Sequence, residues 1–200
     1  MRKIYITLAL LIIGTLSFAG PGLGIKGGAN FASQNTSSFL PSVEISTSNI
    51  TGFVGGAYLN YFFGDKSAIQ IELLYSRKGS VSEILQGGSS VQSNDNKLTY
   101  FDIPVLFRWQ IIKFLNIHAG PQFSILTKAV TEDGTTSEDI KDELKNSDFG
   151  LIVGAEANLP LRLNITARYI FGLTDISDVD EIKMKNSTFQ LTLGIRLIGN

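Results

Sequence analysis

The chain of 200 residues contains one histidine, His118, and this residue limits the catalytic chemistry that the sequence can support. A nucleophilic serine and its histidine base must converge. Ser124 lies in the same predicted strand but six residues away, which is roughly 20 Å along a strand. Because the chain has no cysteine, zinc would need carboxylates around this single histidine. We therefore expect His118 to be a structural residue of the interior, and we expect no catalytic residue, no cofactor and no metal site.

A group of carboxylates suggests acid–base catalysis at first, but basic residues share their predicted face. The whole set consists of Lys26, Glu72, Asp102, Arg108, Glu156, Arg168 and Arg196. Charges that leave water must be paired, because their desolvation is costly. A mixed set of acids and bases on one face therefore predicts a salt-bridge network that closes an interior space.

A second acidic group lies in the polar segment 129–146. It consists of Glu132, Asp133, Glu138, Asp139, Asp142 and Glu143. The group lacks the evenly spaced ligands and the glycine of a calcium loop. It predicts a solvated loop instead.

The segment 115–125 shows the element that must position these side chains. Its odd positions are apolar and its even positions are polar or glycine. The same alternation recurs at 147–159, 161–173 and 187–197. A period of two indicates a strand with one face toward an apolar medium and the other toward a polar one. Broad, aromatic-rich apolar faces opposite charged residues and glycines are typical of lipid-facing barrel strands.

Eight such strands account for most of the chain. We expect them at 22–32, 51–63, 68–79, 97–109, 115–128, 147–159, 161–173 and 187–198. The connections alternate between long polar segments (33–50, 80–96, 129–146 and 174–186) and short ones (64–67, 110–114 and the region of Pro160). This order is typical of outer-membrane barrels, which have tight periplasmic turns and long outer loops. The sequence predicts an all-β fold, a single eight-stranded antiparallel up-and-down transmembrane β-barrel. The alternative is a soluble, ligand-carrying barrel of the lipocalin type.

The first residues have the pattern of a secretory signal peptide. A positive start (Met1-Arg2-Lys3) precedes the apolar run 4–13, and Ser17-Phe18-Ala19 provides small residues for cleavage. The alternative is an uncleaved anchor, but the apolar stretch is shorter than the ~20 residues of a spanning helix. We expect a signal-peptide helix at 1–19, cleaved near Ala19, and a barrel domain at 20–200. The formal charge of −1 argues against nucleic acid as a partner.

Alternation also assigns the two faces of the wall. The outward rows are Ile69 to Tyr75, Phe101 to Trp109, Leu163 to Phe171 and Phe189 to Leu197, each taken at every second residue. Residues 53–63 leave both faces partly apolar, because Val54, Tyr58 and Phe62 fall on the supposed inner face. Beside the short turns we expect membrane-interface aromatics, where amphipathic rings prefer the headgroup level. They are Tyr61, Phe63, Trp109 and Phe114.

Several short motifs resemble those of the PorT-type, porin-like outer-membrane β-barrel proteins. They are Gly24-Ile25-Lys26-Gly27-Gly28-Ala29-Asn30, Tyr100-Phe101-Asp102-Ile103-Pro104, Ala119-Gly120-Pro121, Gly154-Ala155-Glu156, the stretch 167–174 and Leu193-Gly194-Ile195-Arg196-Leu197. The resemblance covers the chain after the signal peptide and implies a small eight-stranded barrel of the bacterial outer membrane. It also implies outer-membrane lipid and the barrel-assembly machinery as partners.

These features favour a structural or surface-interaction role in the cell envelope. Long polar loops on a rigid scaffold are where binding residues concentrate, and we expect an unknown surface partner there. The alternatives are a narrow porin-like channel for small solutes and, less favoured, a lipid-modifying outer-membrane enzyme. We expect a monomer without enzymatic activity.

Overall fold

The computed structural model describes residues 21–38, 44–86, 89–132, 136–177 and 182–199. The expected signal peptide, 1–19, lies outside the described residues. Within them, the wall consists of β1 (Gly22–Ser38), β2 (Glu44–Phe62), β3 (Ser67–Gln86), β4 (Ser89–Ile112), β5 (Leu115–Glu132), β7 (Ser147–Asn158), β8 (Leu163–Gly172) and β9 (Ile182–Ile198). A short strand, β6 (Ser137–Asp139), pairs with β5. Two 3-10 turns, η1 (Lys141–Glu143) and η2 (Pro160–Arg162), lie in connections. No helix among the described residues is long and apolar enough to cross a membrane.

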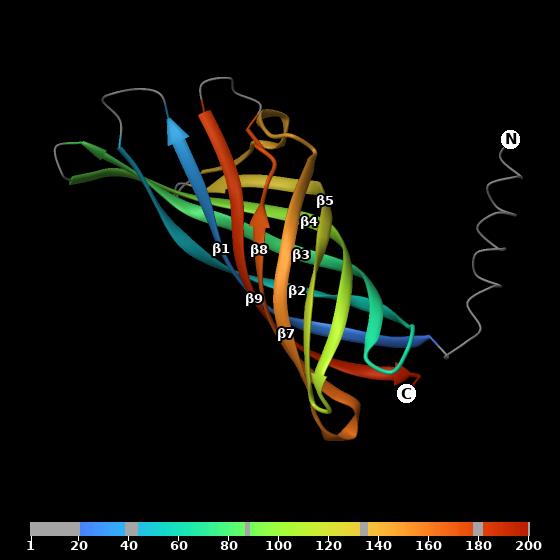
Figure 1. The fold of residues 1–200 in the computed structure, drawn as a ribbon. Coiled ribbons are helices and arrows are strands. Elements are labelled where there is room, and N and C mark those ends of the chain that lie inside the picture. The colour runs from blue at the N-terminus through green and yellow to red at the C-terminus, as the bar shows by residue number, and fades with distance from the viewer. Residues whose placement is uncertain (1–20, 39–43, 87–88, 133–135, 178–181, 200) are drawn as a thin grey trace, which may run out of the picture.

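The eight long strands close into a barrel (Figure 1). Each strand pairs antiparallel with its neighbours, and β9 returns to pair with β1 from Leu23–Ile198 to Ser38–Ile182. The connections at 63–66, 113–114 and 159–162 are short and meet at one end of the barrel, which we call the short-turn mouth. The opposite end is the long-loop mouth. The predicted eight-stranded antiparallel barrel is confirmed.

The strands run further toward the long-loop mouth than the sequence predicted. Much of the expected loops 33–50 and 80–96 is strand, since β3 and β4 pair as far as Gln86–Ser89. The pairing of β1 with β2 stops at Ala32–Ile50, although β1 continues along β9 and β2 continues along β3. Two separate sheets therefore extend beyond the closed barrel. Alternation could not reveal these extensions, because their Ser- and Asn-rich residues carry no apolar face.

The outward rows that the sequence predicts are exposed or half-buried apolar side chains. Most residues on the opposite face of the strands are buried. Val54 and Tyr58 of β2 do face the interior, with 2% and 3% exposure, and Phe62 lines a cavity there. An apolar exterior around a polar interior is the reverse of a soluble globular protein, and it suits a wall in lipid.

Glycines on the inner face allow the wall to coil tightly. A Cβ on Gly28 would lie 2.0 Å from the carbonyl oxygen of Leu191, and one on Gly120 would lie 2.1 Å from that of Val105. Both contacts are with the backbone of the neighbouring strand, which cannot move aside. These positions therefore require glycine because the strands approach each other closely in a narrow barrel.

Candidate functional site

The lumen holds nearly all the charged residues that the sequence assigns to it. Lys26, Glu72, Asp102, Arg108, Glu156 and Arg168 are all buried, and Arg196 is half-buried at the short-turn mouth. Alternation along the strands brings them to the inner face, and closure of the barrel brings distant strands together.

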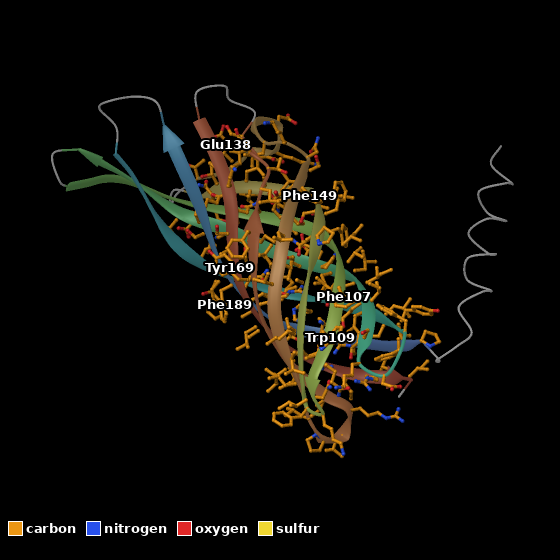
Figure 2. All side chains as sticks on the ribbon, in the orientation of Figure 1. Phe107, Trp109, Glu138, Phe149, Tyr169 and Phe189 are labelled. Atoms are coloured by element: carbon orange, nitrogen blue, oxygen red, sulfur yellow. The ribbon has the colours of Figure 1, made fainter. Side chains whose placement is uncertain are left out.

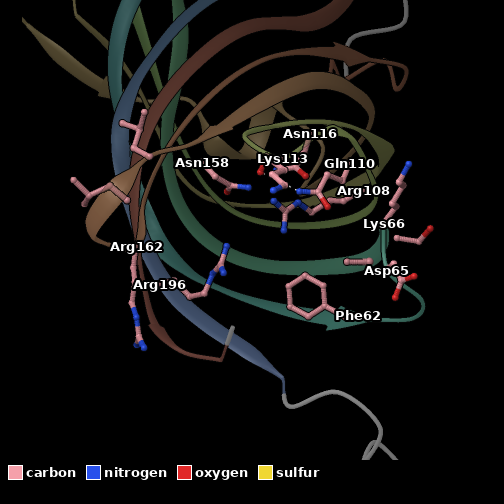
Figure 3. A pocket seen from close by; sticks show the side chains of 14 residues that line it. Phe62, Asp65, Lys66, Arg108, Gln110, Lys113, Asn116, Asn158, Arg162 and Arg196 are labelled. Atoms are coloured by element: carbon pink, nitrogen blue, oxygen red, sulfur yellow. Dashed lines mark hydrogen bonds between the residues drawn. The ribbon is translucent and has the colours of Figure 1, made fainter.

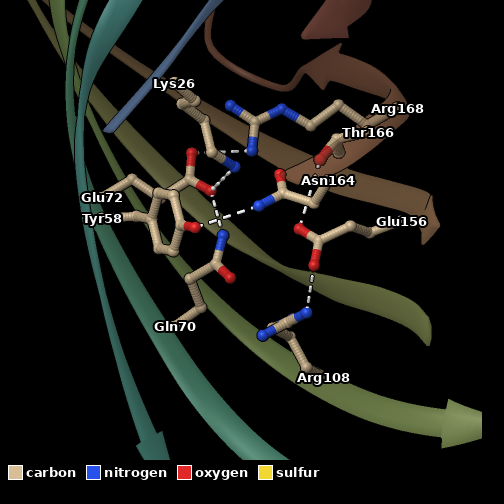
Figure 4. A network of polar contacts seen from close by, with 9 residues as sticks. All are labelled: Lys26, Tyr58, Gln70, Glu72, Arg108, Glu156, Asn164, Thr166 and Arg168. Carbon is tan, nitrogen blue, oxygen red and sulfur yellow. Dashed lines mark hydrogen bonds and ion pairs between the residues drawn. The ribbon is translucent and has the colours of Figure 1, made fainter. Parts of the chain in front are cut away.

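Glu72 forms the centre of the largest charged cluster (Figure 4). Its carboxylate on β3 accepts a hydrogen bond from Lys26 of β1 at 2.7 Å and another from Arg168 of β8 at 2.8 Å. The two bases use different carboxylate oxygens, and Gln70 also donates to the oxygen that Lys26 contacts. The Lys26 ammonium lies 5.0 Å from the centre of the Tyr58 ring. These contacts cross the lumen and tie opposite parts of the wall together.

Glu156 forms a second cluster closer to the short-turn mouth. Arg108 of β4 donates to one of its oxygens, and the Thr166 hydroxyl donates to the other at 3.2 Å. Nearby, the Asn164 amide donates to the Tyr58 hydroxyl at 3.0 Å. Figure 4 shows both clusters within one network.

Asp102 pairs with a base that the sequence analysis missed. Lys78 of β3 lies 3.0 Å from its carboxylate and 4.9 Å from the centre of the Tyr100 ring. Alternation along β3 could have assigned this residue to the inner face, because Lys78 lies an even number of positions from Glu72. Asp148 is also buried, and it accepts a hydrogen bond from Asn186 at 2.8 Å. Among the described residues, four buried acids therefore face four buried bases, with Arg196 in addition.

Amide and hydroxyl side chains fill the lumen between the charged clusters and the long-loop mouth. Asn30 donates to Ser76 at 2.8 Å and accepts from Gln190 at 2.6 Å. Ser80 donates to Gln34 at 2.6 Å. These side chains form a network across several strands, as expected when eight strands enclose an interior that side chains fill.

His118 lies in the lumen wall and is buried. Its side chain packs against Gly154, where an added Cβ would lie 2.7 Å from its Nε2 atom. Ser124 accepts a hydrogen bond from Gln122 at 3.1 Å instead. Ser124 and His118 are separated along β5, because they lie opposite Asp148 and Gly154 of β7, respectively.

An apolar cluster, which we call the cap, lies at the long-loop mouth. Leu144 and Ile176, from the connections after β5 and β8, join four buried wall residues: Leu98, Tyr100, Leu126 and Ala129. Backbone hydrogen bonds hold the two connections together, with Lys145 donating to Ile176 at 2.9 Å. Part of each of these two predicted loops thus folds inward and packs on the wall formed by β4 and β5. The sequence reading missed this cap because it classed both segments only as polar loops.

Part of the acidic group in 129–146 also has specific contacts. Glu132 pairs with Lys97 of β4, and Asp139 accepts from the backbone of Lys141 at 3.0 Å. Asp133 lies outside the described residues. Within the described part of the chain, no three potential ligands gather around a common point that could hold a metal ion.

The short-turn mouth contains a cavity of about 390 Å³ (Figure 3). Its lining includes Lys66, Arg108, Lys113, Arg162 and Arg196, with Asp65 as the acid. In contrast to the long-loop mouth, no chain segment folds into this space among the described residues. The cavity is therefore open at the end of the lumen and rich in positive charge.

Aromatic side chains gather at both ends of the outer surface. Near the short turns, the rings of Phe63 and Phe107 lie 6.1 Å apart, and Trp109 and Phe114 are exposed. Tyr61, also expected there, is half-buried. A second set lies toward the long-loop mouth, including the pairs Phe31–Phe189, Phe53–Tyr75 and Tyr169–Phe171. Figure 2 shows members of both sets on the wall.

Residues 20–178 match the sequence profile of the outer membrane protein beta-barrel domain. Neisserial surface protein A has a similar structure, with a TM-score of 0.57 and 15% identity over 89% of this chain and 99% of that protein. OprG from Pseudomonas aeruginosa is also similar, with a TM-score of 0.53 and 9% identity over 91% of this chain and 98% of that protein. Ail, the attachment invasion locus protein of Yersinia pestis, has a TM-score of 0.50 and 18% identity over 88% of this chain and 99% of that protein. No curated protein has a significantly similar sequence.

Proposed function

We propose a function from one premise: the chain belongs to the outer membrane protein beta-barrel domain family and is an integral barrel of the bacterial outer membrane. Its role is a structural or surface-interaction role in the cell envelope, carried by the part of the barrel outside the membrane. With an even number of strands, the short turns face the periplasm and the long-loop mouth faces outward. Within the family, the motifs around Gly28, Pro104 and Gly154 support the PorT-type group.

The packing of side chains inside the lumen is the observation that carries this proposal. Solute passage would have to cross both the charged clusters around Glu72 and Glu156 and the apolar cap of Leu144 and Ile176. Opening the charged clusters would leave charges unpaired in a low-dielectric interior, at a cost of several kcal/mol. A barrel whose lumen is packed at two levels is suited to act as a rigid scaffold.

The outer ends of the strands supply the surface for a partner. Beyond the Ala32–Ile50 pair, β1 remains attached to β9 and β2 remains attached to β3, so that two sheets diverge outside the barrel. Rigidly supported outer segments are where binding residues concentrate. Neisserial surface protein A and Ail carry names that describe surface location and attachment, and we propose a role of this kind here.

A narrow channel for small solutes is the second candidate. The cavity of about 390 Å³ at the short-turn mouth favours it, because a basic vestibule attracts anions. Single-channel recording in planar bilayers distinguishes the two. The packed scaffold gives no large, steady conductance, whereas such a conductance from the wild type would establish a diffusion channel.

We propose that the chain is neither an enzyme nor a nucleic-acid-binding protein. A lipid-modifying enzyme needs a nucleophile, a base and an acid converging on one wall, whereas Ser124 and His118 lie six residues apart on β5. The proposed partners are outer-membrane lipid, the barrel-assembly machinery and a surface molecule, with the barrel as a monomer. The interface aromatics Tyr61, Phe63, Trp109 and Phe114 would anchor the periplasmic rim.

Shortening the outer segments tests the surface role directly. In a strain that lacks the gene, each long loop is shortened in turn; for β3–β4, Asn-Gly replaces 84–92, so that the paired residues Glu83 and Ser93 flank the turn. Insertion is checked by the shift of the folded barrel on an unheated gel. We expect at least one shortened barrel to insert but fail to restore the envelope phenotype, while Arg168→Ala restores it. If all four shortened barrels restore it and Arg168→Ala does not, the lumen is the working part.

A further inference from the structure

The cavity at the short-turn mouth has an excess of positive charge that the rest of the lumen lacks. Lys66, Arg108, Lys113, Arg162 and Arg196 line it, and only Asp65 among the lining residues is acidic. Glu156 neutralises Arg108. Leaving aside Arg162, whose guanidinium points away from the cavity, four bases against these two acids leave a formal excess of two positive charges, in a chain whose net charge is −1. Elsewhere in the described lumen, buried acids and bases balance.

Two guanidinium groups point into this space from different strands. Figure 3 shows Arg108 of β4 and Arg196 of β9 directed into the hollow, whereas Arg162 points away from it. The Arg162 guanidinium instead donates to the carbonyl of Leu197 at 3.3 Å. Among the described residues, Arg196 forms no ion pair within 4.0 Å. Its charge is therefore available to a ligand.

The same cavity contains buried hydrogen-bond donors without acceptors. The Nε atoms of Arg108 and Arg196 and the Nδ2 atom of Asn116 are buried and have no partner among the described residues. Arg108 and Asn116 are only 4% and 6% exposed. A buried donor without an acceptor is costly, and all three are N–H groups beside one cavity. Their common complement is an anion that presents several acceptor oxygens.

We propose that this cavity is a binding site for a soluble oxyanion, a periplasmic solute that carries a phosphate or carboxylate group. Arg108, Arg196 and Asn116 would hold the oxygens, and Lys66 and Lys113 at the exposed rim would attract the solute from the periplasm. A volume of about 390 Å³ suits a small molecule rather than a bare ion. The cavity opens along the barrel axis, inside the wall, so the ligand comes from solution rather than from the surrounding lipid.

This site is independent of the proposed surface role, because it lies at the opposite end of the barrel from the divergent strands. A variant that loses anion binding should still restore the envelope phenotype, and a loop-shortened variant should still bind the anion. The two proposals can therefore fail separately.

Inorganic phosphate is the first probe. The full barrel is purified in octyl glucoside, which contains no phosphate, and phosphate is titrated at constant ionic strength set with sodium chloride. The ¹⁵N–¹H signals of the arginine Nε groups report binding without any substitution in the site. We expect saturable shifts of the Arg108 and Arg196 signals. Citrate, a carboxylate anion, is titrated in the same way as the second probe. If neither phosphate nor citrate causes a saturable response, the proposal is overturned.

Matched variants locate the site. Arg196→Gln removes one charged donor and should weaken phosphate binding about tenfold. Arg77→Gln removes the same charge from an exposed side chain near the long-loop mouth and should leave binding unchanged. Equal weakening by both variants would show that only the overall charge matters and would overturn the site. If Arg196→Gln does not fold, Lys113→Gln at the exposed rim should still weaken binding severalfold.

A comparison in lipid nanodiscs tests whether the bound group belongs to a soluble anion or to a lipid headgroup. The barrel is compared in nanodiscs of phosphatidylcholine alone and of phosphatidylcholine with phosphatidylglycerol, both without added phosphate. We expect the Arg196 signal to be the same in both discs. A shift caused by phosphatidylglycerol, together with no response to phosphate or citrate, would overturn the assignment to a soluble ligand.

Discussion

The two mouths of the lumen are built from the same strands but end in opposite ways. At the long-loop mouth, Leu144 and Ile176 fold back onto the wall and form an apolar cap. At the short-turn mouth, the side chains of the last strand residues surround an open, basic cavity. The difference follows from the length of the connections. A two- to four-residue turn cannot reach back into the lumen, whereas the connections after β5 and β8 are long enough to supply a plug.

The charged clusters between the mouths belong to neither pattern. They combine full burial, as at the cap, with ionised groups, as at the open cavity. Such clusters depend on complete pairing, because an unpaired buried charge is far more costly than a missing apolar contact. The comparison therefore predicts a gradient of sensitivity to substitution, with the largest effects in the middle of the lumen.

The largest effect is expected from Glu72→Gln. This change leaves Lys26 and Arg168 facing a neutral amide, and removing one partner of a buried ion pair typically costs about 3–5 kcal/mol. The free energy of unfolding can be measured by urea titration in lipid vesicles, with the fluorescence of Trp109, the one tryptophan in the chain, as the signal. A loss below about 1 kcal/mol would mean that the cluster does not hold the lumen together.

The next effect is expected from Ile165→Arg on the outside of the wall. Ile165 pairs with Leu193, which is the middle of the outward row Phe189 to Leu197. A charge near mid-membrane on the lipid face costs about 2–4 kcal/mol. The same titration measures the loss, and Ile165→Val is the control. A variant that stayed folded and soluble without detergent would contradict the membrane-spanning wall.

A smaller effect is expected from Ile176→Ala in the cap. Truncating a fully buried isoleucine costs about 2–3 kcal/mol, toward the lower end of the usual range because a surface connection can partly collapse. Leu161→Ala is the contrast at the short-turn mouth, where Leu161 is 85% exposed and its truncation should change stability by less than about 0.5 kcal/mol. Equal losses from both substitutions would remove the distinction between the two mouths.

The smallest effect is expected from Glu132→Gln at the outer rim. Its partner Lys97 and the glutamate are 28% and 41% exposed at their side chains, and exposed pairs contribute less than about 1 kcal/mol. The double-mutant cycle with Lys97→Gln measures the coupling energy. High salt should reduce this small coupling but should not change the effect of Glu72→Gln, because buried pairs are poorly screened.

Alternation predicted the barrel wall well because a period of two is a property of each strand by itself. It assigned Lys26, Glu72, Arg108 and Glu156 to the interior only from their positions in the alternating pattern. It could not predict that Lys78 rather than an arginine would pair with Asp102, since pairing depends on the register between strands. The apolar cap was also out of reach, because Leu144 and Ile176 lie in polar segments without a repeating pattern.

The seam between β1 and β9 sets the order in which this chain must fold. Every other ladder between the eight long strands joins two that are neighbours along the chain, apart from the short β6 between β5 and β7, whereas the seam joins Leu23 to Ile198. Closing so long a loop carries an entropic cost that the hairpins do not have, and contacts between residues distant in sequence slow folding. One edge of β1 therefore stays unpaired until β9 is in place, and an unpaired strand edge is a template for pairing with other chains. Protection of that edge between export and closure is a requirement that this topology places on the cell.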